Sequence, residues 1–98
     1  MPKHNFSAIL AHYPKTIRDM PDTFTSHQFI LRLAQRHQKL YIEALHRYQD
    51  EPAPFRVVHA ILAKRLHDSK QIERIRRDAP STNIFGQSNQ CAEWRKLK

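Results

Sequence analysis

Glycine is almost missing from this chain of 98 residues, which contains a single one, Gly86. A sequence of this length has about seven glycines at average usage. The P-loop and the dinucleotide-binding fingerprint both need several glycines at fixed spacing, because the backbone must approach phosphate closely. The sequence therefore excludes both motifs.

Cysteine is equally scarce, because Cys91 is the only one. A single cysteine cannot form a disulfide within the chain, which is typical of proteins from a reducing compartment. None of the seven histidines lies three or four positions from another, and the nine acidic residues form no paired pattern. We therefore expect no metal site, no cofactor and no enzymatic activity.

Long apolar runs are lacking as well. The first 15 residues hold no apolar stretch of signal-peptide length, and no other stretch approaches the length of a membrane span. We expect a cytoplasmic protein with no membrane partner. A chain of this length with 40% hydrophobic and 27% charged residues suits one small globular domain.

Acidic residues are few: nine Asp and Glu stand against 17 Lys and Arg, which gives a formal net charge of +8. Residues 1–53 have seven basic and five acidic residues, whereas residues 54–98 have ten and four. Such an excess favours an anionic partner, such as nucleic acid or an acidic protein. We expect the surface that binds it to lie in the second half.

The clearest helical pattern covers residues 26–49, where apolar residues recur every three or four positions. Ser26 is a suitable N-cap, because its side-chain oxygen can accept from the first free amides. The pattern fits one unbroken helix and equally two shorter helices that bend near residues 37–39. After the proline-rich turn, Pro54 suits the first position of a further helix.

The helix after Pro54 has two distinct faces at 100° per residue. Its apolar face contains Phe55, Val58, Ile61, Leu62 and Leu66. The opposite face contains Arg56, Ala60, Ala63, Lys64 and His67. Small residues flanked by basic ones would let this helix approach an anionic surface closely.

The two ends of the chain are less regular. Three prolines punctuate residues 1–21, which we expect to form an N-terminal arm packed on the domain of residues 22–98. Residues 72–77 suit a helix or a strand, and residues 90–98 suit a short strand. If the two pair as a hairpin, residues 78–90 form its tip, with Gly86 turning at positive φ and Ile84 and Phe85 returning to the core.

This order of elements resembles the winged helix-turn-helix domains of DNA-binding proteins. The likeness covers residues 22–97. It rests on "SHQFILRLAQRH", "KLYIEALHRYQ" and "PFRVVHAILAKRLHD" as helices, "IERIRR" and "CAEWRKL" as wing strands, and "DTFT" as an edge strand. It implies a mainly α fold with a small β-hairpin, a three-helix winged-helix-like domain. The alternative is one long helix over 26–49 with a shorter helix and a hairpin.

The resemblance also implies how the protein would bind duplex DNA. In such domains the third helix lies in the major groove and the wing touches the backbone beside it. The corresponding residues here are Arg56, Ala60, Lys64 and His67 on the helix, and Arg74, Arg76 and Arg77 beside the wing. We expect a transcriptional regulator or a DNA-associated accessory protein. A homodimer would add the specificity that one reading helix lacks.

A second hypothesis belongs to another class of function. Under it the chain is a non-enzymatic protein-interaction module that binds an acidic partner through Ile84 and Phe85. Exposure of these two side chains favours an interface, and burial favours a loop pinned to the core.

Overall fold

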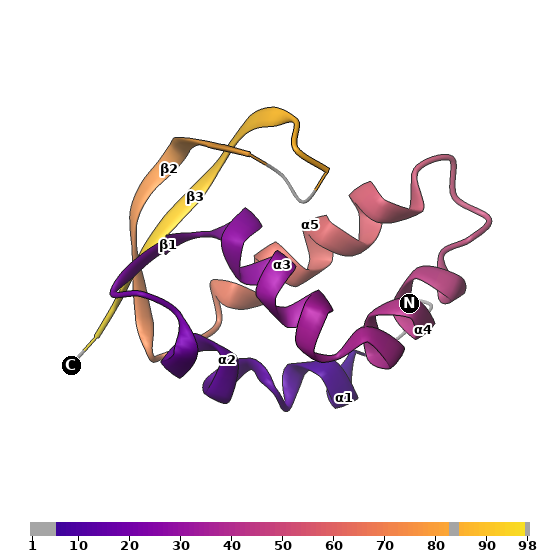
Figure 1. The fold of residues 1–98 in the computed structure, drawn as a ribbon, viewed down its shortest axis with the longest axis horizontal. Helices are drawn as coiled ribbons and strands as arrows, with labels where there is room; N and C mark the ends of the chain where they lie inside the picture. The colour runs from indigo at the N-terminus through magenta and orange to yellow at the C-terminus, as the bar shows by residue number, and fades with distance from the viewer. Residues whose placement is uncertain (1–5, 83–84, 98) are drawn as a thin grey trace.

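Both helices and a sheet build this fold, with about half of the chain in helices and a quarter in strands. The computed structural model describes residues 6–82 and 85–97. The helices are α1 (Ser7–Leu10), α2 (Tyr13–Asp19), α3 (Ser26–Arg36), α4 (Gln38–Arg47) and α5 (Pro54–Leu66). The strands are β1 (Thr23–Thr25), β2 (Ile72–Thr82) and β3 (Ser88–Lys96) (Figure 1).

This is an α+β fold, so the expected mainly α, three-helix winged-helix-like domain with a small hairpin is wrong as a fold class. The strands β2 and β3 are 11 and 9 residues long, and both extend well into residues 78–90, which were expected to be a loop. Only Ile72 and Ala79 are buried along β2. Because the strand buries so little, no alternation of apolar and polar residues marks it in the sequence.

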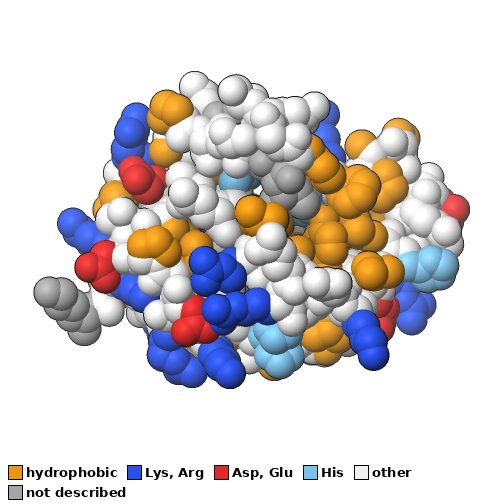
Figure 2. Space-filling model, in the orientation of Figure 1, with side chains coloured by type: hydrophobic (Ala, Val, Ile, Leu, Met, Phe, Trp, Pro, Cys, Tyr) orange, Lys and Arg blue, Asp and Glu red, His pale blue; other side chains and the backbone are white. Residues whose placement is uncertain are grey.

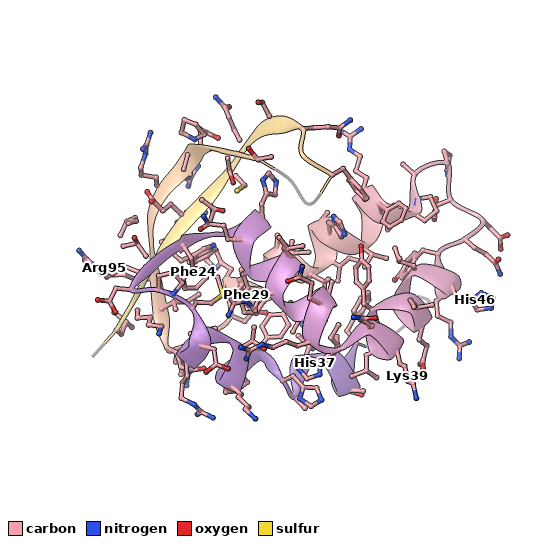
Figure 3. The ribbon with its side chains drawn as sticks, in the orientation of Figure 1. Phe24, Phe29, His37, Lys39, His46 and Arg95 are labelled. Atoms are coloured by element: carbon pink, nitrogen blue, oxygen red, sulfur yellow. The ribbon has the colours of Figure 1, made fainter. Side chains whose placement is uncertain are left out.

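Residues 26–49 form two helices, so the alternative of one unbroken helix is also wrong. His37 separates α3 from α4 with φ −129° and ψ 55°, outside the helical region. Its ring stacks on His12, with 3.8 Å between ring centroids. Figure 3 shows His37 at this junction, where α3 meets the turn between α1 and α2. The apolar pattern continues across the break because both helices face one core.

The first turn of α3 begins one residue earlier than expected. Thr25 is the N-cap in place of Ser26, and it forms a capping box with Gln28. The hydroxyl of Ser26 instead accepts a buried hydrogen bond of 2.9 Å from the indole Nε1 of Trp94. Ser26 therefore joins the start of α3 to the sheet.

The sheet is antiparallel with the order β1–β3–β2, so β3 is central. Phe24 of β1 lies opposite Trp94 of β3, and both side chains are buried. The ring of Phe24 is 6.1 Å from that of Phe29 on α3 (Figure 3). One apolar cluster thus packs the inner face of the sheet against the helices.

The segment expected to be an arm contributes α1 and α2 to this same cluster. The side chains of Phe6, Ile9 and Ile17 are almost completely buried. The hydroxyl of Tyr13 donates a 2.7 Å hydrogen bond to the carbonyl of Leu62 on α5. The hydrogen bond therefore ties together two helices that lie far apart in the sequence.

The distal half of the hairpin leaves this body and arches over α5 (Figure 1). The pairing of β2 with β3 shifts register between Arg74 and Arg76 and again between Arg76 and Ala79. Such bulges bend and twist a strand pair. Both irregularities lie between Ile72 and Ala79, the two buried residues of β2.

Replacing Ser26 with alanine should lower the free energy of unfolding by about 1–3 kcal/mol, because the buried indole N–H of Trp94 would lose its acceptor. Urea unfolding followed by circular dichroism measures this change. Ser88→Ala removes an exposed serine of β3 and should change stability by less than about 0.5 kcal/mol. Equal stability of the two variants would contradict a role for the Ser26 hydrogen bond.

Candidate nucleic-acid interface

A groove of about 1030 Å³ lies between α5 and the β2–β3 hairpin. We call it the α5–hairpin groove. The helix forms one wall, the hairpin forms the other, and the first turn of α3 contributes Ser26 and His27. Figure 2 shows this face hollowed beneath the hairpin, with hydrophobic side chains gathered beside the opening.

Five of the seven residues expected to contact DNA line this groove: Arg56, Ala60, Lys64, His67 and Arg74. All five are exposed. Four of them lie on the face of α5 opposite its buried residues, and Arg74 of β2 lines the same groove from the hairpin. Arg76 and Arg77 are also exposed, but on the bulged part of β2 away from the lining.

The groove is basic. Arg56 and Lys64 from α5 and Arg74 from β2 face it together with one carboxylate, that of Asp68. Within the described residues, none of these three cations lies within ion-pair distance of a carboxylate. Cations that converge on a concave surface raise the local concentration of anions.

Two basic residues elsewhere on the surface illustrate the opposite case, because each has a carboxylate partner. Arg95 of β3 pairs with Glu73 of β2, and Arg36 at the end of α3 pairs with Asp19. Figure 3 shows Arg95 on the sheet, far from α5. The Arg36 guanidinium holds the pKa of the Asp19 carboxyl below its ordinary value. Their charge is therefore partly neutralised, in contrast to that of the groove.

The tip of the hairpin touches the first turns of α5. The ring of Phe85 lies 4.9 Å from that of Phe55, edge to face, and 6.1 Å from that of His59, stacked. Gly86 follows at φ 80°, which confirms the expected positive φ. Phe85 is nevertheless 53% exposed, so the tip rests on the helix rather than in the core. Ile84, the other expected contact, lies outside the described residues.

The position of Phe55 on the apolar face of the helix predicted that its side chain is part of the core. In the structure it lies outside the core. It is 44% exposed and lines the groove. The buried residues of α5 are Val58, Leu62 and Leu66, which begin one turn later. Because Phe55 lies in the first turn, at the end of the helix that the sheet does not cover, it meets the hairpin tip instead.

His59 connects the groove to α4. Its Nε2 is 2.5 Å from the hydroxyl of Tyr41. Burial lowers the pKa of His59, with a smaller contribution from His27, and burial raises the pKa of Tyr41 to about 12. Both groups are therefore uncharged near neutral pH. They present a polar but neutral part of the wall.

The inner end of the groove contains His27 and Trp94. Burial lowers the pKa of His27. Its Nδ1 is buried and has no hydrogen-bond partner among the described residues. The ring of His67 meets that of Trp94 edge to face, with 6.0 Å between centroids. Rings thus stand at both ends of the groove, with cations along its rim.

Sequence reasoning did not identify His27 and His59 as groove residues. They lie on different helices, 32 positions apart, and neither belongs to a spaced motif. The only sequence feature that could have indicated them is their position beside the apolar stripes of α3 and α5. Histidines often occupy such positions in half-buried helices, so this feature does not distinguish a groove residue.

In the part of the chain that the structure describes, no group of three or more His, Cys, Asp and Glu side chains is placed to hold a metal ion. Among the same residues, none of the helices has the length and apolar character needed to span a bilayer. Cys91 lines the groove and is half-buried.

Comparison of the chain with models of protein families, with curated proteins and with solved structures gives no match. The resemblance to winged helix-turn-helix domains therefore stays a prediction.

Acidification should destabilise the protein through His59. Because its pKa in the folded state lies below the ordinary value of about 6.5, the unfolded state binds the proton first as the pH falls. The stabilisation is complete above pH 6.5 and is lost as the pH falls toward the lowered pKa. The loss from this ring should stay below about 1.4 kcal/mol per pH unit, because one imidazole takes up at most one proton, and its partial exposure to water reduces the loss further.

Urea unfolding at pH 7.5, 6 and 5 measures this dependence. His59→Gln should make it shallower between pH 6.5 and 5, while His27 and His37, whose pKa values burial also lowers, keep the rest of the slope. Tyr41→Phe keeps the imidazole and removes only its hydroxyl partner, so this control should retain most of the slope. An unchanged slope in His59→Gln would show that the burial of this ring does not set its protonation.

Proposed function

We propose that this chain binds nucleic acid, and duplex DNA in particular, with the α5–hairpin groove facing the sugar–phosphate backbone. One observation carries the proposal: Arg56 and Lys64 of α5 and Arg74 of β2 converge on one groove without carboxylate partners in the described part of the chain. Phosphates could supply the missing partners. Binding would then release counterions from the nucleic acid.

The spacing on α5 supports contact with a groove of the duplex. Arg56, Ala60 and Lys64 follow one another at intervals of four, so they form a single ridge along the helix. Ala60 leaves room at the centre of this ridge, while the two cations reach outward on either side. The major groove is about 12 Å wide and admits one α-helix.

The hairpin would supply the remaining phosphate contacts. Arg74 faces α5 across the groove, and Arg76 and Arg77 are exposed where β2 bulges. A backbone that passes between helix and hairpin would therefore meet cations from both. One such unit reads few bases, so a homodimer or an accessory role beside another DNA-binding protein suits this proposal.

The exposure of Phe85 favours a second candidate function, in which the chain binds an acidic protein through the hairpin tip. Phe85 and Phe55 form an exposed aromatic pair next to the basic groove. Under this alternative, Phe85→Ala abolishes binding of the protein partner. The same alternative predicts no binding of duplex DNA even at low salt.

Fluorescence anisotropy with a labelled random-sequence duplex tests the proposal. Between about 50 and 200 mM salt, three or four phosphate contacts should reduce affinity by about 40- to 150-fold. Arg56→Ala/Lys64→Ala should weaken binding at each salt concentration. It should also lower the slope of log K against log salt by about two, because two phosphate contacts are lost.

The matched control is Lys39→Ala/Arg47→Ala, which removes the same charge from exposed positions of α4 outside the groove. Figure 3 shows Lys39 on α4, away from the hairpin. This control should keep the wild-type slope. If both double variants lower the slope equally, DNA binding depends only on the net charge of the protein. That result would contradict the assignment of the groove as the binding site.

A further inference from the structure

We infer that the α5–hairpin groove takes up one unpaired base of the bound nucleic acid, in addition to facing its backbone. This inference rests on the proposed function and names the form of nucleic acid that the site prefers. Three features of the groove carry it: its volume, the rings at its two ends and the separation of its charged rim from its neutral interior.

The volume exceeds what contact with a backbone requires. About 1030 Å³ lies between helix and hairpin, at the upper end of the range of about 300–1,000 Å³ typical of sites for small organic ligands. Phosphates held by Arg56 and Lys64 would stay at the mouth, because both side chains are exposed. The inner wall includes Ile30, Ala63 and Ala92, which offer water few hydrogen-bond partners.

The rings at both ends suit a planar occupant. Phe85 and His59 stack at the tip of the hairpin, and Trp94 borders the inner end. Bases stack on aromatic side chains with little regard to sequence, because every base has a π-face. The lowered pKa values of His27 and His59 support this assignment, since neutral imidazoles add no charge beside a neutral base.

The distribution of charge matches that of a nucleotide. Three cations lie at the rim on opposite walls, together with the exposed carboxylate of Asp68, which pairs with Arg65. The histidines of the interior, His27 and His59, are uncharged near neutral pH. A nucleotide likewise joins an anionic phosphate to a neutral planar base. A base inside a duplex is held in its stack, so the groove could accept only one that is unpaired or flipped out.

The test compares a fully paired duplex of about 20 base pairs with the same duplex carrying one unpaired adenine. Anisotropy at about 100 mM salt should give roughly tenfold tighter binding of the second probe, as expected when one base stacks on aromatic side chains. Trp94 is the only tryptophan of the chain and borders the groove, so the emission comes from one known position. Its emission should change with the unpaired probe and stay nearly constant with the paired one.

Phe85→Ala should reduce the ratio of the two affinities to about one, because the ring that stacks on the base is lost. Phe85→Tyr keeps the ring and should keep the ratio. Ile42→Ala removes an exposed apolar side chain of α4 outside the groove, and this control should also keep the ratio. Because Phe85 and Ile42 are exposed, neither change endangers folding.

The outcomes separate this inference from the proposed function. Salt-dependent binding of both probes with equal affinity would overturn the inference and leave nucleic-acid binding intact. A lack of binding to either probe at low salt would overturn both. If the peptide Glu-Glu-Phe-Glu-Glu displaces the unpaired probe at equal concentration, the groove binds acidic protein segments and the inference is wrong.

Discussion

Trp94 holds the sheet to the helices, and the shape of the groove depends on this attachment. Its side chain lies opposite Phe24 on β1, its indole donates to Ser26 at the start of α3, and its ring meets His67 just after α5. Three parts of the chain thus meet at one buried residue, which is only 4% exposed. Because the base of the hairpin is fixed there, the remaining strands extend outward over α5.

The two attachments of the hairpin differ in strength. Trp94 at the base is buried and hydrogen-bonded, whereas Phe85 at the tip touches Phe55 and His59 with about half of its surface exposed. Between them β2 buries only Ala79. With so few apolar side chains to fill it, the space beneath the arch stays a groove instead of becoming a second core. The same polar strands leave Arg74 facing that space.

Helical periodicity was the most informative signal in this sequence. It identified most of the buried side chains of α3 and α5, with Phe55 the exception, because residues such as Leu33 and Leu62 must face a common core. It did not decide whether the chain breaks at His37, since the stripe continues across the break. The N-cap was assigned one residue late because Thr25 and Ser26 are both good caps, and the choice depends on the hydrogen bond of Ser26 to Trp94.

The strands and the groove were harder to predict. Much of β2 and β3 is polar and buries little, so the pairing that extends them leaves no pattern in the sequence. The basic residues of α5 could be named because they share one helical face. That Arg74, His27 and Trp94 border the same groove depends on long-range packing, which no local spacing encodes. The prediction that Phe55 lies in the core was wrong for the same reason. The sequence shows which helical face it shares, but not which elements pack against that end of the helix.

Amide chemical-shift mapping by NMR tests the central claim most directly, because it locates the surface that nucleic acid contacts. Titration with a random-sequence duplex should perturb the amides of α5 around Ala60 and those of β2 around Arg74. The amides of α4 around Lys39 should stay unchanged. Perturbations confined to α4 or to the outer face of the sheet near Arg95 would contradict the assignment of the α5–hairpin groove as the binding surface.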